Sequence, residues 1–172
     1  LMKKKIFNLS NYIYEPIFDS LIKNGNGIAN SSVVVKKEKL INIDLISEKN
    51  EKYSWEDFDC WLRLAFKKNK FYFINKALGY IWTGSGRVSN DEQLYINSKN
   101  FVKIYKNSIR DIFGNTNIRP IWISNIYANY FFKKREYLKS FYFSKKITKK
   151  SFKLKIKYII SYLVILFKKC AS

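Results

Sequence analysis

Histidine is absent from this 172-residue chain, and cysteine, proline and glycine are scarce. Without histidine there is no histidine-based catalytic triad, and two cysteines, Cys60 and Cys170, are too few for a disulfide framework or a zinc cluster. So few cysteines also fit a reducing compartment. Two prolines, six glycines and a hydrophobic content of 47% argue against long disordered stretches. The chain is long enough for one domain with an appendage.

Acidic side chains are also scarce, with 13 Asp+Glu against 33 Lys+Arg and a formal net charge of +20. The excess is concentrated near the C-terminus, where residues 133–172 hold 13 basic side chains and one acid, Glu136. Such a surplus indicates a polyanionic partner, which is either an anionic membrane surface or a nucleic acid.

The residue pattern divides the chain at about residue 90. Residues 1–90 predict a mixed α/β region, and residues 91–172 predict an all-helical basic extension. In the first region we expect a helix that ends at Gly25, a strand over 28–35, a short helix over 36–43, a helix over 57–68, strands over 71–75 and 77–82, and a Gly/Ser loop over 83–90. In the second we expect one helix over 91–112 closed by Gly114, another over 121–143, and a helical tail.

The few acids gather in the stretch YSWEDFDCWLRLAFKKNKF, where Glu56, Asp57 and Asp59 lie at the start of a predicted helix. One interpretation is structural. Ser54 and Asp57 have the spacing of a capping box, and Asp59 and Arg63 have the i, i+4 spacing of a helix ion pair.

The other interpretation is catalytic, because Trp55 and Trp61 flank these acids. Desolvation and like-charge repulsion raise the pKa of a carboxylate, although the helix dipole opposes them. A carboxylate tuned in this way can take a proton from a hydroxyl, and aromatic faces suit a sugar ring.

The surrounding residues are NGIANSSVVVKKEKL and then YSWEDFDCWLRLAFKKNKFYFINKALGYIW. They form a Ser-Ser strand, a short helix, a loop that ends in Glu-Asp-x-Asp-x-Trp-Leu-x-Leu, and a strand pair. This series resembles the C-terminal half of the catalytic domain of family 2 glycosyltransferases, over roughly residues 10–90. The resemblance implies a partial GT-A fold, which is the α/β fold of nucleotide-diphospho-sugar transferases.

The resemblance also implies an activity, namely transfer of a sugar from a nucleotide sugar to an acceptor with inversion at the anomeric carbon. It assigns Asp57 as the base that deprotonates the acceptor hydroxyl, with Glu56 and Asp59 in support. The implied partners are a nucleotide sugar, with a UDP-sugar favoured, and a glycan or lipid-linked acceptor of bacterial surface polysaccharide synthesis. The residues expected to contact sugar or acceptor are Asn30, Ser31, Ser32, Trp55 and Arg87.

Three departures from the family pattern bear on this assignment. The chain has INIDLI where the family often has Gly-Gly-Phe-Asp, and GYIW lacks the Arg that commonly follows the Tyr, so Arg87 is the expected substitute. The Gln-x-x-Arg-Trp motif of processive synthases is absent, which favours transfer of a single sugar.

The donor-binding half of the family ends in an Asp-x-Asp motif that follows an apolar strand. Asp57-Phe58-Asp59 matches the Asp-x-Asp pattern, but the preceding segment EKNEKYSWE is polar. We therefore reject residues 57–59 as the metal-binding motif. We therefore expect Mg²⁺ or Mn²⁺ to serve the full enzyme through ligands outside this chain. We also expect the chain to be inactive by itself.

The tail contains the apolar run YIISYLVILF, residues 158–167, which spans about 15 Å as a helix, or half of a bilayer core. We therefore expect no transmembrane span here. Lysines at 153, 155, 157, 168 and 169 flank the run. They favour an interfacial helix over 152–169 at the inner face of the cell membrane. A core helix with solvated lysines is the open alternative.

Two other classes of function stay open. Lys and Arg interleaved with aromatic residues, as in YFFKKREYLKSFYFSKK, are compatible with nucleic-acid binding, but no RNP, KH or helix-turn-helix signature accompanies them. We therefore favour a chain that binds no nucleic acid. A non-catalytic subunit that completes another protein is the third class.

The expected location of the donor site gives the first prediction. Isothermal titration of the isolated chain with a UDP-sugar and Mg²⁺ or Mn²⁺ should detect no binding in the micromolar range, because the diphosphate and cation ligands lie outside these residues. Micromolar binding would contradict the assignment of this chain to the acceptor side.

Overall fold

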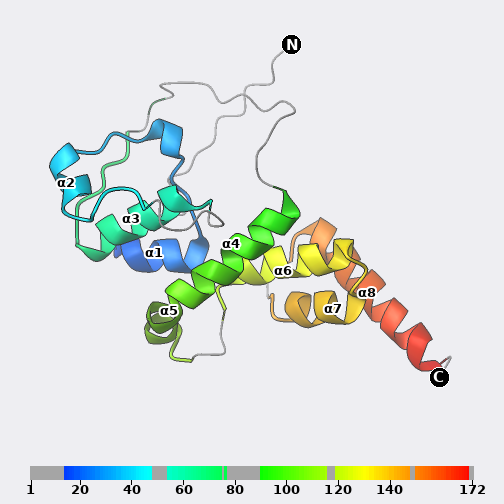
Figure 1. Ribbon diagram of the computed structural model, residues 1–172. Helices are drawn as coiled ribbons and strands as arrows, with labels where there is room; N and C mark the ends of the chain where they lie inside the picture. The colour runs from blue at the N-terminus through cyan, green and yellow to red at the C-terminus, as the bar shows by residue number, and fades with distance from the viewer. Residues whose placement is uncertain are drawn as a thin grey trace, which may run out of the picture. The chain divides into compact units, whose positions relative to one another are not determined.

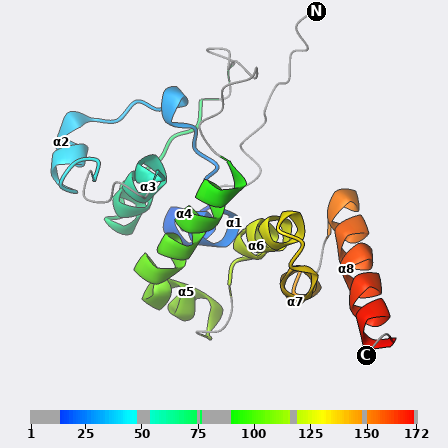
Figure 2. The ribbon, with the colours of Figure 1, turned by 45° about the vertical axis from the view of Figure 1, so that its right-hand side comes forward.

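The computed structural model describes residues 14–47, 54–74, 76, 90–115, 119–147 and 150–170. The chain divides into two compact units, residues 1–88 and 89–172, and each is described by itself. Figures 1 and 2 show the helices of both units from two directions.

The first unit is built around two amphipathic helices that pack against each other, α1 (Ile17–Asn24) and α3 (Glu56–Phe66). Each has one apolar face, which must leave water for the helix to be stable in a small unit. Leu21 and Ile22 of α1 and Phe58 and Leu62 of α3 are almost fully buried. The predicted helix over 57–68 is confirmed.

Short elements connect these two helices. The helix α2 (Lys37–Ile41) confirms the predicted helical turns, and η2 (Asn30–Ser32) is a single 3-10 turn. Gly25 follows α1 with a φ of 88°, a backbone conformation that favours glycine, and it ends the helix as predicted.

The predicted strand over 28–35 is wrong. Val33 has extended dihedral angles, φ −114° and ψ 139°, as its β-branched side chain favours, but Asn30–Ser32 forms a turn and Val34 is fully exposed. A strand requires a neighbouring strand to satisfy its backbone N–H and C=O groups. Among the described residues no such neighbour is present.

The α/β, partial GT-A fold class is therefore contradicted, because the described part of the chain is helical and holds no sheet. Residues 71–74, the described portion of another predicted strand, have no regular structure. The predicted strand over 77–82 and the loop over 83–90 lie outside the described residues, apart from Asn90.

The second unit is helical, as the sequence predicts, but its helices are shorter. The predicted helix over 91–112 is divided at Tyr105, and Gly114, with φ 71°, closes the second segment as expected. The predicted helix over 121–143 is divided at Arg135, where φ is 59°. The five helices are α4 (Asp91–Ile104), α5 (Lys106–Phe113), α6 (Ile121–Lys133), α7 (Tyr137–Lys145) and α8 (Phe152–Cys170).

Aromatic rings hold these helices together. On α6, Tyr127 meets Phe143 of α7 edge to face with a centroid separation of 4.9 Å, and Phe131 stacks on the same ring at 5.7 Å. Tyr95 of α4 stacks on Tyr130 of α6 at 4.1 Å. Aromatic pairs contribute roughly 0.5–1.5 kcal/mol each beyond their buried area. The helix α6 is therefore the centre of the unit.

The tail forms one 19-residue helix, α8, that packs on α7 (Figure 2). Phe141 of α7 stacks on Tyr158 and on Tyr162 with centroid separations of 4.9 and 5.7 Å. Within the described ranges, no helix combines the length and apolar character that crossing a bilayer requires.

Candidate functional site

The candidate site lies in the first turn of α3, which carries three acids. Glu56, Asp57 and Asp59 interact favourably with the positive end of the helix dipole. The capping residue is Trp55, whose side chain makes no capping hydrogen bond. The helix begins one residue after the position that a cap at Ser54 predicts.

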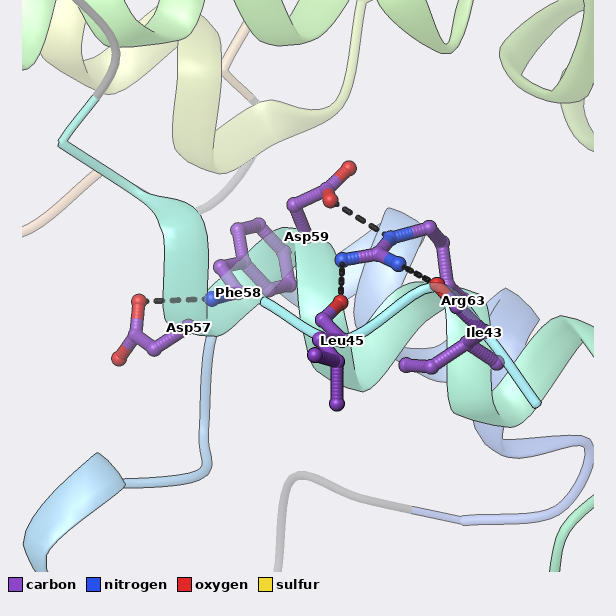
Figure 3. A network of polar contacts seen from close by, with 6 residues as sticks. All are labelled: Ile43, Leu45, Asp57, Phe58, Asp59 and Arg63. Atoms are coloured by element: carbon purple, nitrogen blue, oxygen red, sulfur yellow. Dashed lines mark hydrogen bonds and ion pairs between the residues drawn. The ribbon is translucent and has the colours of Figure 1, made fainter. Parts of the chain in front are cut away.

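Asp57 is about half buried, and its carboxylate accepts a hydrogen bond from the backbone N–H of Phe58 at 2.6 Å (Figure 3). Burial is the largest influence on this group and raises its pKa, and the charge of Glu56 raises it further. The N–H of Phe58 and the amide of Asn26 act in the opposite direction. Asp57 is therefore a carboxylate whose ionised form is partly destabilised, as a general base requires.

Asn26 is a residue of this site that the sequence analysis missed. It lies in the loop after α1, and its Nδ2 is 3.5 Å from Oδ2 of Asp57. The side-chain oxygen of Asn26 accepts a hydrogen bond from the backbone N–H of Ile28 at 3.0 Å, which turns the amide nitrogen toward the carboxylate. The sequence NGNG predicts a turn, but nothing in it predicts which acid the amide meets.

Asp59 is held in an ion pair within α3. Its Oδ2 accepts from Nε of Arg63 at 2.8 Å, so the predicted i, i+4 ion pair is confirmed (Figure 3). The same guanidinium donates to the carbonyl oxygens of Ile43 and, at 2.8 Å, of Leu45. Both side chains of the pair are largely covered, so Asp59 orients the arginine that ties the turn after α2 to α3.

The two tryptophans beside the acids are in different environments. Trp55 is partly exposed and meets the ring of Phe58 edge to face at 6.1 Å, so part of its surface is accessible to a ligand. Trp61 is 3% exposed and belongs to the core of the first unit. Its indole N–H is buried without a hydrogen-bond partner among the described residues. Of these two tryptophans, only Trp55 has accessible ring surface.

The other predicted contact residues are not held against the carboxylate of Asp57 as Asn26 is. Asn30, Ser31 and Ser32 form the exposed turn η2, in which the hydroxyl of Ser32 donates to the carbonyl of Ala29 at 2.8 Å. Arg87 lies outside the described residues. The residues that the structure does bring together are Asn26, Glu56 and Asp57.

Asp57 and Asp59 do not fit a divalent cation. Their carboxylates point to different sides of α3 (Figure 3), and Asp59 is already paired with Arg63. A cation held by two carboxylates requires oxygens that converge within about 2–2.6 Å of one point. Across the described ranges, no group of His, Cys, Asp or Glu side chains is arranged to hold a metal ion.

The second unit contains a polar cavity of about 270 Å³ among α4, α6 and α8. Lys157 donates to Oδ1 of Asn129 at 2.5 Å at its edge, and Lys133 forms an ion pair with Asp91. Burial lowers the pKa of Lys157, and the nearby charge of Lys133 lowers it further. Because the ammonium groups already have protein partners, the contact of Lys157 serves the packing of α8 on α6, and the contact of Lys133 serves the packing of α4 on α6.

Comparison with known proteins assigns no family to this chain. Neither a protein-family model, nor a curated protein, nor a solved structure matches this chain. The candidate site therefore depends on its own geometry and on the motif resemblance.

The opposing influences on Asp57 give the second prediction. Asn26→Ala should raise the pKa of Asp57, because a donor to the carboxylate is lost, and Glu56→Gln should lower it, because a repelling charge is lost. An NMR titration of the carboxyl carbons measures both shifts. Asp44→Asn, at an exposed acid after α2, should leave that pKa unchanged. Shifts of the same sign in Asn26→Ala and Glu56→Gln would contradict this account.

The arginine network gives the third prediction. Arg63→Met should lower the free energy of unfolding by roughly 1.5–3 kcal/mol, because two backbone carbonyls and Asp59 lose their charged donor. Lys67→Met, at an exposed position at the end of α3, should change it by less than about 0.5 kcal/mol. Urea denaturation followed by circular dichroism measures both values, and equal midpoints would refute a structural role for Arg63.

Proposed function

We propose that the first turn of α3 activates an acceptor hydroxyl for sugar transfer from a nucleotide sugar, with Asp57 as the general base. The observation that carries this proposal is the state of Asp57. It is a half-buried carboxylate with a raised pKa, held by neutral donors, beside a partly exposed tryptophan. Among the ion pairs of the described residues, none uses Asp57.

In the proposed reaction an acceptor hydroxyl donates its proton to Asp57 while its oxygen attacks the anomeric carbon of the donor sugar. The bond from that carbon to the nucleoside diphosphate breaks, and the diphosphate leaves with the electron pair. A single displacement of this kind inverts the anomeric carbon. Asn26 and the N–H of Phe58 hold the carboxylate in position, and the ring of Trp55 supports an apolar face of the sugar.

The geometry favours Asp57 over the other two acids of the cluster. Asp59 is already held in an ion pair by Arg63, which leaves its carboxylate less available to an acceptor hydroxyl. Glu56 is exposed, and its role in the proposal is to raise the pKa of Asp57 through its negative charge. Asn30, Ser31, Ser32 and Arg87 stay secondary candidates for contact with the substrates.

The donor side of the reaction is proposed to lie outside these residues. The donor is a nucleotide sugar, with a UDP-sugar favoured, and the acceptor is a glycan or lipid-linked glycan. A divalent cation would bind with the donor, since the carboxylates of α3 do not fit one. We place the reaction on the cytoplasmic side of the cell membrane, because both cysteines are free thiols, as is usual in a reducing compartment.

The role of Asp57 gives the fourth prediction. Asp57→Asn should lower sugar transfer by roughly 100- to 10,000-fold, the usual contribution of a general base. The measurement is incorporation of radiolabelled sugar into lipid-linked glycan in lysates of cells that express the protein. In the wild type, transfer should fall as the pH drops through the raised pKa of Asp57, and Glu56→Gln should move this decline to lower pH.

Asp44→Asn is the matched control, since it removes an exposed carboxylate outside the site and should leave transfer unchanged. If Asp57→Asn kept full transfer, the chain would act as a non-catalytic subunit. In that case the proposed role of the acid cluster would be abandoned.

A further inference from the structure

The face of α8 that points away from the other helices is apolar along its whole length. At 100° per residue, seven exposed side chains cover an arc of about 120°, and no polar residue interrupts it. Their exposed fractions run from 38% to 77%. We call this set the outward stripe; its members are Phe152, Ile156, Ile159, Ile160, Leu163, Leu166 and Phe167.

Contacts on the opposite side of α8 fix the rotation of the helix. Leu154 is buried in a cluster with Ala128 and Ile147, and Ser161 is fully buried. Phe141 of α7 stacks on Tyr158, which lies on the same side. The outward stripe is therefore exposed because α8 is packed in one orientation, not because the helix lacks a partner.

Basic side chains border the stripe. Lys153 and Lys155 are exposed and lie on its two sides in the first turn. There is no acidic residue anywhere in Phe152–Cys170. An apolar face with lysines at its borders matches the boundary of an anionic bilayer, where the side chains reach acyl chains and the ammonium groups reach phosphates.

We propose that α8 is the membrane-binding element of this protein. The outward stripe enters the boundary between headgroups and acyl chains of an anionic bilayer, and the packing on α7 keeps the helix parallel to the membrane surface. The inference rests on α8 alone and is independent of sugar transfer.

The charge pattern favours lipid over a second copy of the chain. Two stripes packed face to face would bring Lys153 and Lys155 of each copy to the border of the shared interface, and no acid in α8 would compensate them. A nucleic acid would pair with the lysines but would leave the stripe in water. Only an anionic lipid surface satisfies both kinds of side chain.

Flotation of the intact chain with vesicles tests the proposal. The chain should float with vesicles of phosphatidylcholine mixed with phosphatidylglycerol, and far less with phosphatidylcholine alone. The double variant Leu163→Asn, Phe167→Asn should reduce partitioning by roughly tenfold or more, because it removes inserted apolar surface. Ile104→Asn, at an exposed isoleucine on α4, is the matched control and should float like the wild type.

Two further variants test the electrostatic part of membrane binding and the independence of membrane binding from sugar transfer. Lys153→Gln with Lys155→Gln should reduce binding to the anionic vesicles by roughly tenfold and weaken its salt dependence. Asp57→Asn should float normally, so loss of sugar transfer and loss of membrane binding are distinguishable. Circular dichroism checks that each variant keeps its helices, which these exposed positions permit.

A label at the end of α8 reports insertion directly. Cys170 is exposed whereas Cys60 is fully buried, so a thiol-reactive, polarity-sensitive fluorophore should react at Cys170. Its emission should shift to the blue with anionic vesicles. The proposal is overturned if the chain fails to float, or if the stripe variant floats like the wild type. It is also overturned if sedimentation in the absence of lipid shows a dimer that the stripe variant abolishes.

Discussion

Helix α3 buries one face against α1, and this burial decides where each of its acids is directed. With Phe58 and Leu62 held in the core, the helical period of 3.6 residues sends Asp57 and Asp59 to different sides. Asp59 therefore meets Arg63, whereas Asp57 meets the loop after α1. The same packing that stabilises the first unit thus separates a structural acid from the candidate base.

This arrangement has an energetic consequence for Asp57. Its pKa is raised on folding, so the protonated form stabilises the folded state below the unfolded pKa, and that contribution is lost as the pH rises through the folded pKa. An ionised Asp57 at neutral pH therefore lowers stability. A carboxylate retained at such a cost, beside a structural acid that is fully paired, fits a role in chemistry better than a role in folding.

The sequence predicted features that depend on local spacing. The amphipathic period gave the helix around Trp61, the i, i+4 spacing gave the ion pair of Asp59, and Gly114 marked a helix end. The predicted strand over 28–35 was wrong because a strand depends on a distant partner, which β-branched residues alone do not supply. The division of the helix over 121–143 was missed because Arg135, a good helix former, takes a left-handed conformation there.

The sequence by itself determined the register of α3, the concentration of acids at its start and the basic, apolar character of the tail, because each depends on residues close together in the chain. Only the tertiary structure decided that Asn26 meets Asp57 across 31 residues, and which side of α8 is exposed. Both depend on how separate helices pack. The helical period of a sequence defines the faces of a helix but does not determine which face a neighbouring helix covers. In α8 the stacking of Phe141 on Tyr158 sets that rotation.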